Sequence, residues 1–392
     1  MTAAADGTDP WGEVIGQPAA VQAVRTALAR DELAHAWLLV GPRSVGQKQL
    51  SRALGAALNC ADPPTPDAGC GRCPSCVRVL RGTHPAVLDL EPDGAAHVVA
   101  DVREGWIPLA SRSLSEGRRR VLRVVAADRM NEAAQNAFLK ILEEPPPSVV
   151  WVLDAEHDGA LLDTVVSRCR RLDLVPWGPA ALTARADQLG LPPERRDALV
   201  RASGGSPERL EALADAAVAQ ARDRHLEVLD TLATAGPGVV VPLAKELVAW
   251  ARSRSAVVKE RNAEELARLE TEFGVEGGRG WPPRIKQQIT RRHERTERQA
   301  QRQALDLVLD DLASYLRDLI AVASGAGVDT LVNPDAEVAL RRDAARLPIR
   351  DAVEALASVA ACRAALDRNG SPELHLERLL FRIALPVYAA TA

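Results

Sequence analysis

The sequence predicts a multidomain protein in which an α/β domain with a parallel sheet is followed by two helical domains. Short apolar runs alternate with helical segments between residues 37 and 166, as expected for parallel strands joined by helices. Only 3% of the 392 residues are aromatic and 47% are hydrophobic, a composition that favours helices and α/β layers over β-sandwiches. From residue 178 onward, apolar residues recur at spacings of three and four, which indicates helices.

The charge and hydropathy of the chain limit its function. The formal net charge is -4, so any contact with nucleic acid must use a local basic patch rather than a global field. No run of 18 or more apolar residues occurs, so we expect no membrane span. The sequence therefore predicts a soluble, cytoplasmic protein.

The α/β domain begins with a buried strand over residues 37–40, which leads directly into a glycine-rich loop. Gly41 and Gly46 have the spacing of a loop that cradles phosphates, and a helix follows them. However, Gln47 stands at the lysine position, and Lys48 stands where a hydroxyl would hold Mg²⁺. We expect a loop kept for its shape, without ATP binding. Nucleotide binding through Lys48, after a shift of one residue, is the alternative.

Four cysteines follow this helix in the spacing C-x9-C-x2-C-x2-C. Because two-residue spacers let both sulfurs of a turn point at one cation, the cluster predicts a tetrahedral zinc site. Cysteine fills all four positions and leaves none for water, so the zinc should be structural. Buried free thiols and a redox pair are the alternatives. The ligands, which define a module at residues 60–76, are Cys60, Cys70, Cys73 and Cys76.

The rest of the domain repeats the alternation of strand and helix. Strands are expected over residues 86–90, 97–99, 120–126 and 149–153. The first two are separated by a turn at residues 92–94. Helices are expected over residues 101–114, on the surface, and over 131–142 and 161–166. These elements complete a parallel sheet with helices on both faces.

Several motifs in residues 11–175 resemble the bacterial clamp-loader branch of the AAA+ proteins. They are VIGQ at 14–17, HAWLLVGP at 35–42, the four-cysteine module, NAFLKILEEPPP at 136–147 and SRC at 167–169. The delta-prime type of subunit is the most similar, although the ATPase subunits gamma and tau share the last two motifs. The resemblance implies an AAA+ core over 1–176 with an inserted zinc module, a helical lid over 177–218 and a helical collar over 219–392.

The resemblance also shows where ATP chemistry would take place, and these positions are altered. Alignment on NAFLKILEEP places the acidic pair that ends the Mg²⁺-binding strand on Val125 and Ala126, so both carboxylates are missing. We expect the nearby Asp128 to be a solvated loop residue. Ala155 and Glu156 stand where the family has a polar sensor. Without these groups, phosphoryl transfer lacks most of its electrostatic stabilisation.

The lid motif is also altered, whereas the SRC motif is intact. Glu208 falls on the arginine position of the lid motif GSxR, and Arg209 lies one residue late. Arg168 of SRC resembles an arginine finger that acts in trans on the γ-phosphate held by a neighbouring subunit, where such a residue contributes ~10³ to 10⁵ in rate. A surface arginine paired within its own chain is the alternative.

The helical remainder contains a break at residues 274–283 and a basic run at 284–302. Four arginines of this run share one helical face: Arg291, Arg295, Arg298 and Arg302. We expect a solvated face, with DNA phosphates or an acidic partner as the alternative. Apolar stripes over 305–320 and 374–385 are broad enough to pack on other subunits.

With the resemblance, these features predict a non-catalytic subunit of the DNA polymerase III clamp loader, which helps to load the sliding clamp onto primed DNA during replication. The resemblance implies gamma/tau and delta as partners in a heteropentamer, and clamp and primed DNA through the complex. One alternative is an active gamma/tau-type ATPase, which ATP turnover by the isolated chain would reveal. Another is a zinc-dependent DNA-binding module, which predicts tight, salt-sensitive DNA binding by the chain alone.

Overall fold

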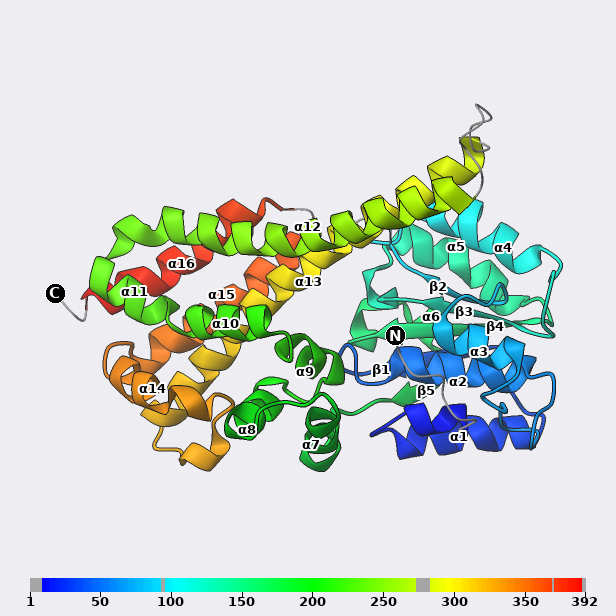
Figure 1. Cartoon of the computed structure of the whole chain (residues 1–392), viewed down its shortest axis with the longest axis horizontal. Helices are drawn as coiled ribbons and strands as arrows, with labels where there is room; N and C mark the ends of the chain where they lie inside the picture. The colour runs from blue at the N-terminus through cyan, green and yellow to red at the C-terminus, as the bar shows by residue number, and fades with distance from the viewer. Residues whose placement is uncertain (1–8, 93–95, 273–282, 369, 390–392) are drawn as a thin grey trace. The chain divides into compact units, whose positions relative to one another are not determined.

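The computed structural model describes residues 9–92, 96–272, 283–368 and 370–389 (Figure 1). The chain divides into two compact units, Met1–Ala214 and Asp215–Ala392. The first unit contains the α/β core, and the second is helical. The finer division into core, lid and collar stays a prediction.

Five parallel strands form the sheet of the first unit, in the order β2-β3-β4-β1-β5. Their bounds are β1 (Ala36–Val40), β2 (Val87–Leu90), β3 (Arg120–Val124), β4 (Val149–Ala155) and β5 (Arg170–Asp173). The predicted parallel α/β core is therefore confirmed. The sequence did not predict β5, an edge strand in which only Leu172 is buried.

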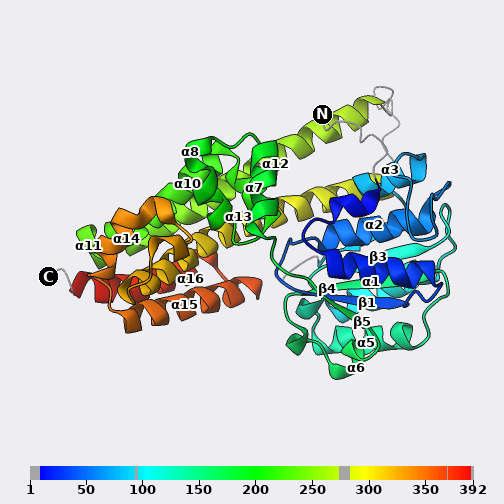
Figure 2. The same ribbon diagram turned by 90° about the horizontal axis from the view of Figure 1, so that it is seen from below.

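Helices cover both faces of this sheet. One face carries α1 (Pro18–Ala29), α2 (Gln47–Asn59) and α3 (Pro74–Arg81). The other carries α4 (Ile107–Ser111), α5 (Glu132–Glu143) and α6 (Asp163–Val166), as Figure 2 shows for α2 and α5. Because side chains alternate along a strand, β4 packs Trp151 against Phe138 of α5 with ring centroids 4.8 Å apart, while its Val152 faces the α2 side.

The predicted strand over residues 97–99 is wrong. His97 makes a single bridge with Met130, and helical structure is established by Asp101. The side chain of Asp101 accepts a hydrogen bond from the backbone N–H of Val98 at 2.8 Å, which favours a helix start over a strand. The helix predicted over 101–114 runs from Asp101 as a π-helical turn and then as α4, ending at Ser111.

That helix lies on the surface as expected and buries one side against the core. Val102, Trp106 and Ala110 are almost inaccessible to solvent. The ring of Trp106 lies edge-on to that of Phe138, with centroids 5.5 Å apart. The turn predicted at residues 92–94 falls mostly outside the described residues.

Three short helices end the first unit: α7 (Pro179–Gln188), α8 (Pro193–Ala202) and α9 (Pro207–Leu213). The chain is fixed where it leaves the sheet, because the N–H of Trp177 donates to the carbonyl of Gly205 at 2.8 Å. Gly205 has a φ of +89°, and a Cβ there would lie 2.4 Å from Cβ of Pro176. Only glycine fits this contact between α8–α9 and the end of the core.

The second unit consists of seven helices in its described part, two of them long. They are α10 (Ala216–Leu226), α11 (Val228–Ala235), α12 (Val240–Glu272), α13 (Pro283–Ala323), α14 (Glu337–Ala344), α15 (Ile349–Asp367) and α16 (Pro372–Ala389). Its core is built around α12 up to Ala251 and around α13 from Ala304 onward. The break predicted at 274–283 lies almost wholly outside the described residues. Within the described part, no helix is long and apolar enough to span a membrane.

Candidate functional site

The glycine-rich loop lies between β1 and α2, at the carboxyl edge of the sheet. A Cβ on Gly41 would lie 2.3 Å from the carbonyl oxygen of Leu174, so the chain after β5 leaves room only for glycine. Gly46 has a φ of +139°, which residues with a side chain rarely adopt. The two glycines therefore fix the path of the loop.

Gln47, the first residue of α2, fills this loop with its own side chain. Its Oε1 accepts hydrogen bonds from the N–H groups of Val45 at 3.0 Å and Gly46 at 3.2 Å. Its Nε2 donates to the carbonyl of Pro42 at 2.6 Å. In a phosphate-binding loop, such N–H groups face the anion. Here two of these donors are already satisfied within the chain.

The carbonyl of Val45 ties the loop to two distant segments. It accepts a hydrogen bond from Nε2 of Gln17 at 2.9 Å and one from Nε1 of Trp177 at 3.0 Å. Gln17 in turn exchanges two hydrogen bonds with the backbone of Val175, at 2.6 and 3.0 Å. The VIGQ motif and the chain after β5 thus hold the loop in one conformation.

No carboxylate occupies the two positions that follow β3, which are Val125 and Ala126. Asp128 is half-buried rather than solvated as expected; burial and the nearby Glu156 raise the pKa of its carboxyl group. Glu156, at the expected sensor position, forms an ion pair with Arg43 of the loop. An internal ion pair therefore links the loop to the end of β4.

The sequence analysis missed a buried ionic cluster on the α2 face of the sheet. Arg123 of β3 forms ion pairs of 2.7 Å with Asp89 of β2 and with Asp154 of β4. Burial raises the pKa of Asp154 to about 6 despite Arg123, whereas for Asp89 Arg123 outweighs burial and lowers the pKa. The sequence signal that could have indicated this cluster is the presence of these charged residues within otherwise apolar strands. Lys48 also lowers the pKa of Asp89, so its charge acts toward this cluster.

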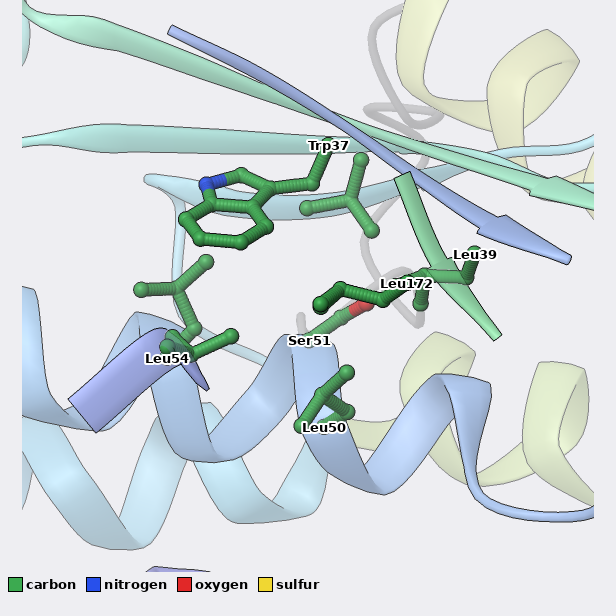
Figure 3. A pocket seen from close by; sticks show the side chains of 8 residues that line it. Trp37, Leu39, Leu50, Ser51, Leu54 and Leu172 are labelled. Atoms are coloured by element: carbon green, nitrogen blue, oxygen red, sulfur yellow. The ribbon is translucent and has the colours of Figure 1, made fainter. Parts of the chain in front are cut away.

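A small apolar cavity separates the sheet from α2 (Figure 3). Its volume is about 10 Å³, at the lower limit for one water molecule. Its lining includes Trp37, Leu39, Leu50, Ser51, Leu54 and Leu172. The cavity is therefore a packing void and not a ligand site.

The four cysteines lie together at the opposite end of α2. Their sulfurs all fall within 4.8 Å of one another, and those of Cys60 and Cys73 are 4.0 Å apart. Zinc–sulfur bonds of about 2.3 Å place tetrahedral ligands about 3.8 Å apart. Backbone N–H groups donate to three of the sulfurs at 3.2–3.4 Å, those of Cys60, Cys70 and Cys73. The predicted gathering of the four sulfurs is confirmed, and the donor set fits zinc.

The ionisation of these thiols differs between neighbours. Burial acts against ionisation of Cys73, but backbone N–H groups, led by that of Cys76, lower its pKa to about 6. Burial raises the pKa values of Cys60 and Cys76. Four thiolates so close together repel one another, so full ionisation of the cluster requires a bound cation.

A chain of buried hydrogen bonds connects the cysteine module to the sheet. The N–H of Ala86 donates to Nδ1 of His84 at 3.1 Å, so Nε2 carries the proton and donates to Oγ of Ser75 at 3.1 Å. Ser75 then donates to the carbonyl of Asn59 at 2.8 Å. Asn59 accepts from the backbone of Arg118 at 2.8 Å. The helix that carries Cys76 is thereby fixed to the ends of α2, β2 and β3.

Arg168 follows α6 and is partly exposed. Its Nη2 forms an ion pair of 2.7 Å with Glu143, and its Nη1 donates to the carbonyl of Thr164 at 2.9 Å. The arginine is therefore oriented within its own chain. In the segment predicted to form a lid, Glu208 is exposed and Arg209 is half-buried, and the backbone N–H of Arg209 donates to Oγ of Ser206 at 3.2 Å.

Comparison with known proteins shows what the first part of the chain resembles. The model described as "DNA polymerase III, delta subunit" matches residues 16–177. A DNA polymerase III subunit delta' of Pseudomonas aeruginosa is 34% identical over 201 residues, which are 50% of this chain and 61% of that protein. The gamma/tau subunit of Mycobacterium tuberculosis is 32% identical over 234 residues, 58% of this chain and 40% of that protein. Over residues 16–177 the chain is therefore similar to the clamp-loader family of AAA+ proteins.

The chain spans only part of the length of these relatives. It covers 40% of the gamma/tau subunit and 61% of the delta' subunit. Among solved structures, a DNA polymerase III gamma subunit-related protein of Thermotoga maritima is similar over 92% of this chain and 97% of that chain, at 16% identity and a TM-score of 0.44. Likeness at that level carries no argument about function.

Proposed function

We propose that this chain is a delta-prime-type subunit of the DNA polymerase III clamp loader and does not hydrolyse ATP. The observation that carries the proposal is the position of Gln47. Its side-chain oxygen accepts from the N–H groups of Val45 and Gly46, where a phosphate-binding loop would present them to an anion. ATP binding would have to break these bonds and the one to Pro42.

The missing acids strengthen the proposal. An active site for phosphoryl transfer needs Mg²⁺ bridging the phosphates, an acid that holds it and a group that positions water. Lys48, Val125 and Ala126 replace the hydroxyl and both carboxylates. The Arg43–Glu156 ion pair places two opposite charges beside the loop, where they neutralise each other.

Arg168 is proposed to act on a neighbouring subunit. In the isolated chain its guanidinium group is paired with Glu143, and the pair is partly exposed. An exposed ion pair of this kind is worth little, typically below about 1 kcal/mol, so exchanging Glu143 for the γ-phosphate of a neighbour costs little. The planar guanidinium group suits that role because it binds phosphate oxygens in a fixed geometry.

The cysteine module is proposed to hold one structural Zn²⁺ through Cys60, Cys70, Cys73 and Cys76. When bound, zinc would supply a cross-link between the end of α2 and the start of α3 and no catalytic chemistry. The remaining chain is proposed to form a lid over 177–218 and a collar over 219–392. The proposed partners are gamma/tau and delta in a heteropentamer, with clamp and primed DNA reached through the complex, in the cytoplasm.

Calorimetric titration of the zinc-loaded chain with Mg²⁺-ATP tests the proposal. We expect no binding at micromolar concentrations and no release of phosphate. A micromolar, Mg²⁺-dependent signal with turnover would favour the alternative, an active gamma/tau-type ATPase. That alternative is kept because a gamma/tau subunit is 32% identical over 234 residues.

A further inference from the structure

Helices α12 and α13 extend well beyond the core of the second unit. Among the described residues, the last core residue of α12 is Ala251 and the first of α13 is Ala304. Residues 252–272 and 283–303 therefore form a two-helix arm, visible in Figure 1 as the green and yellow helices that run side by side. At 1.5 Å per residue, each helix of the arm is about 30 Å long.

A polar seam fixes the register of the two helices. Oγ of Ser255 donates to the carbonyl of Glu297 at 3.0 Å, and Nδ2 of Asn262 donates to Oγ1 of Thr296 at 3.2 Å. Asn262 and His293 are each only 8% exposed. Polar seam residues specify register at a cost in stability. The arm therefore contributes little hydrophobic stabilisation. Its fixed register gives the side chains on its outer surface defined positions.

The arm differs in charge from the rest of the chain. Residues 252–303 contain thirteen basic and eight acidic residues, a net charge of +5, in a chain whose net charge is -4. The segments 252–272 and 283–303 contain no Phe, Trp or Tyr. The arm is thus a basic surface without stacking groups, carried by an otherwise acidic protein.

The basic side chains gather on one flank. Arg261 and Arg268 are seven residues apart, two helical turns, and therefore share a side of α12. Both are exposed, and within the described part of the chain no ion pair or hydrogen bond is recorded for either side chain. Arg292 of α13 joins this flank through its ion pair with Glu265. Arg295 is a neighbour of Arg292 on the surface of α13, and Arg298 lies one further step of three residues round the helix.

Acidic residues offset only part of the charge of this flank. Glu297 faces the seam, where its Oε1 accepts from Asn262 at 3.1 Å. Glu294 contacts Arg298 only loosely, at 3.8 Å, and both side chains are at least 60% exposed. On α12, helical spacing places Glu264 and Glu265 beside Arg261 and Arg268. Together with Glu294 they offset three of the five charges of the flank made of Arg261, Arg268, Arg292, Arg295 and Arg298, which keeps a small net positive charge.

We propose that this flank binds the sugar–phosphate backbone of a nucleic-acid duplex. Arg261 and Arg268 are about 10 Å apart along the helix, so a rigid helix presents several guanidinium groups to a regularly spaced polyanion. Arginine is suited to phosphate oxygens. The segments 252–272 and 283–303 contain no aromatic residue, so they offer no stacking platform for unpaired bases. Contacts to the backbone of a duplex do not depend on its base sequence. The inference goes beyond the function proposed above, since it concerns a surface of the second unit and not the ATP chemistry.

Fluorescence anisotropy with a labelled duplex of mixed sequence tests this, using the full zinc-loaded chain at several salt concentrations. The arm variant replaces Arg261, Arg268 and Arg298 by alanine. The matched control replaces three exposed arginines of the same unit, Arg341, Arg350 and Arg382, by alanine. Because each phosphate contact contributes about 0.9 to the slope of log K against log salt, the arm variant should lose up to about 3 units of slope.

A second variant, with lysine at the same three arm positions, should largely keep the slope because the charges remain; this separates lost charge from a folding defect. The proposal is overturned if the original chain does not bind duplex at low salt, or if arm and control variants weaken binding equally. If polyglutamate displaces the labelled duplex as effectively as unlabelled duplex does, the flank is instead assigned to an acidic protein.

Discussion

The two ends of α2 carry the two candidate sites, and they differ in what they still require. At the first end, the side chain of Gln47 satisfies the N–H groups of Val45 and Gly46. At the other end, Cys60 and three further cysteines bring their sulfurs within 4.8 Å of one another. The first end is closed by its own side chain. The second end gathers four donors that together suit one cation.

This difference shows that a familiar loop shape is not enough to make a binding site. A loop N–H that is already hydrogen-bonded gains little from a phosphate, because one bond merely replaces another. Clustered thiolates gain much from zinc, because the cation removes their mutual repulsion. We therefore expect the cysteine end of α2 to respond to zinc. The phosphate-loop end should respond to mutation but not to ATP.

The largest effect should come from the cysteine end. Replacing Cys73 by serine removes a ligand, and we expect bound zinc to fall from about one per chain to well below that. A ligand present at about 1,000 times its Kd stabilises the folded state by about 4 kcal/mol, and the variant should lose a stabilisation of this order. Elemental analysis and denaturant unfolding measure the two quantities.

Cys362 provides the control, because it is buried in the core of the second unit and is not one of the four clustered cysteines. Its replacement by serine should leave zinc content unchanged. If the freshly purified, reduced chain contains no zinc, or if the Cys73 variant retains it fully, the four cysteines do not form the proposed zinc site.

A smaller effect is expected at the phosphate-loop end. Gln47→Ala leaves two buried N–H groups and one carbonyl without their partners, which should lower the free energy of unfolding by about 1–3 kcal/mol. Gln22→Ala is the matched control, since Gln22 is exposed and bonds only to Thr26 on the surface of α1. Its effect should stay within about 0.5 kcal/mol.

Gln47→Lys restores the lysine of the phosphate loop and tests whether this residue alone prevents ATP turnover. We still expect no ATP turnover, since Val125 and Ala126 supply no acid for Mg²⁺. Phosphate release is measured in the presence of Mg²⁺-ATP. Turnover by this single variant would show that the site is intact apart from one residue.

The sequence predicted those elements whose burial is uniform. Strands β1, β3 and β4 are buried along their whole length, so each appears as an apolar run. In β5, by contrast, Arg170, Arg171 and Asp173 are exposed, and the pattern contained too few apolar residues to indicate a strand. An edge strand such as β5 pairs with one neighbour only and is less buried, so its sequence needs fewer apolar residues and is harder to recognise as a strand.

The candidate sites were predictable where spacing alone determines proximity. The C-x2-C steps bring sulfurs together in any fold that accepts them. The closure of the loop by Gln47 depends on one side-chain conformation, which a sequence pattern does not specify. The cluster of Asp89, Arg123 and Asp154 depends on the pairing of three strands, and the spacing along the chain does not reveal it.

His84 should make the cysteine end sensitive to pH. Burial lowers its pKa below the ordinary value of 6.5, so between 6.5 and the folded value the unfolded chain holds more protons. Its contribution is therefore fully present above pH 6.5 and is lost as pH falls through the folded pKa. Denaturant unfolding between pH 7.5 and 5.5 should show a steeper loss for the original chain than for His84→Gln.

Glutamine preserves an acceptor for Ala86 and a donor for Ser75 without titrating, so the difference in slope isolates the imidazole. The effect should be smaller than that of Gln47→Ala. The exposed His157, replaced by glutamine, serves as control and should leave the slope unchanged. Equal slopes for the original chain and His84→Gln would remove His84 from the pH response.

Arg168 should have the smallest effect on the chain itself, because its ion pair with Glu143 is partly exposed. Arg168→Ala should change the free energy of unfolding by no more than about 0.5 kcal/mol and leave zinc content unchanged. In the proposed assembled complex it should slow clamp- and DNA-stimulated ATP hydrolysis by the partner subunits, since a trans arginine stabilises charge on the transferred phosphoryl group.

Arg168→Lys should not restore the rate, because an ammonium group lacks the fixed planar geometry of the guanidinium group. Glu143→Ala removes the same ion pair but keeps the arginine, and its complex should remain active. If the Arg168→Ala complex loads clamps at the unmodified rate, the residue is a surface arginine and only the cysteine end of α2 has a ligand-dependent role.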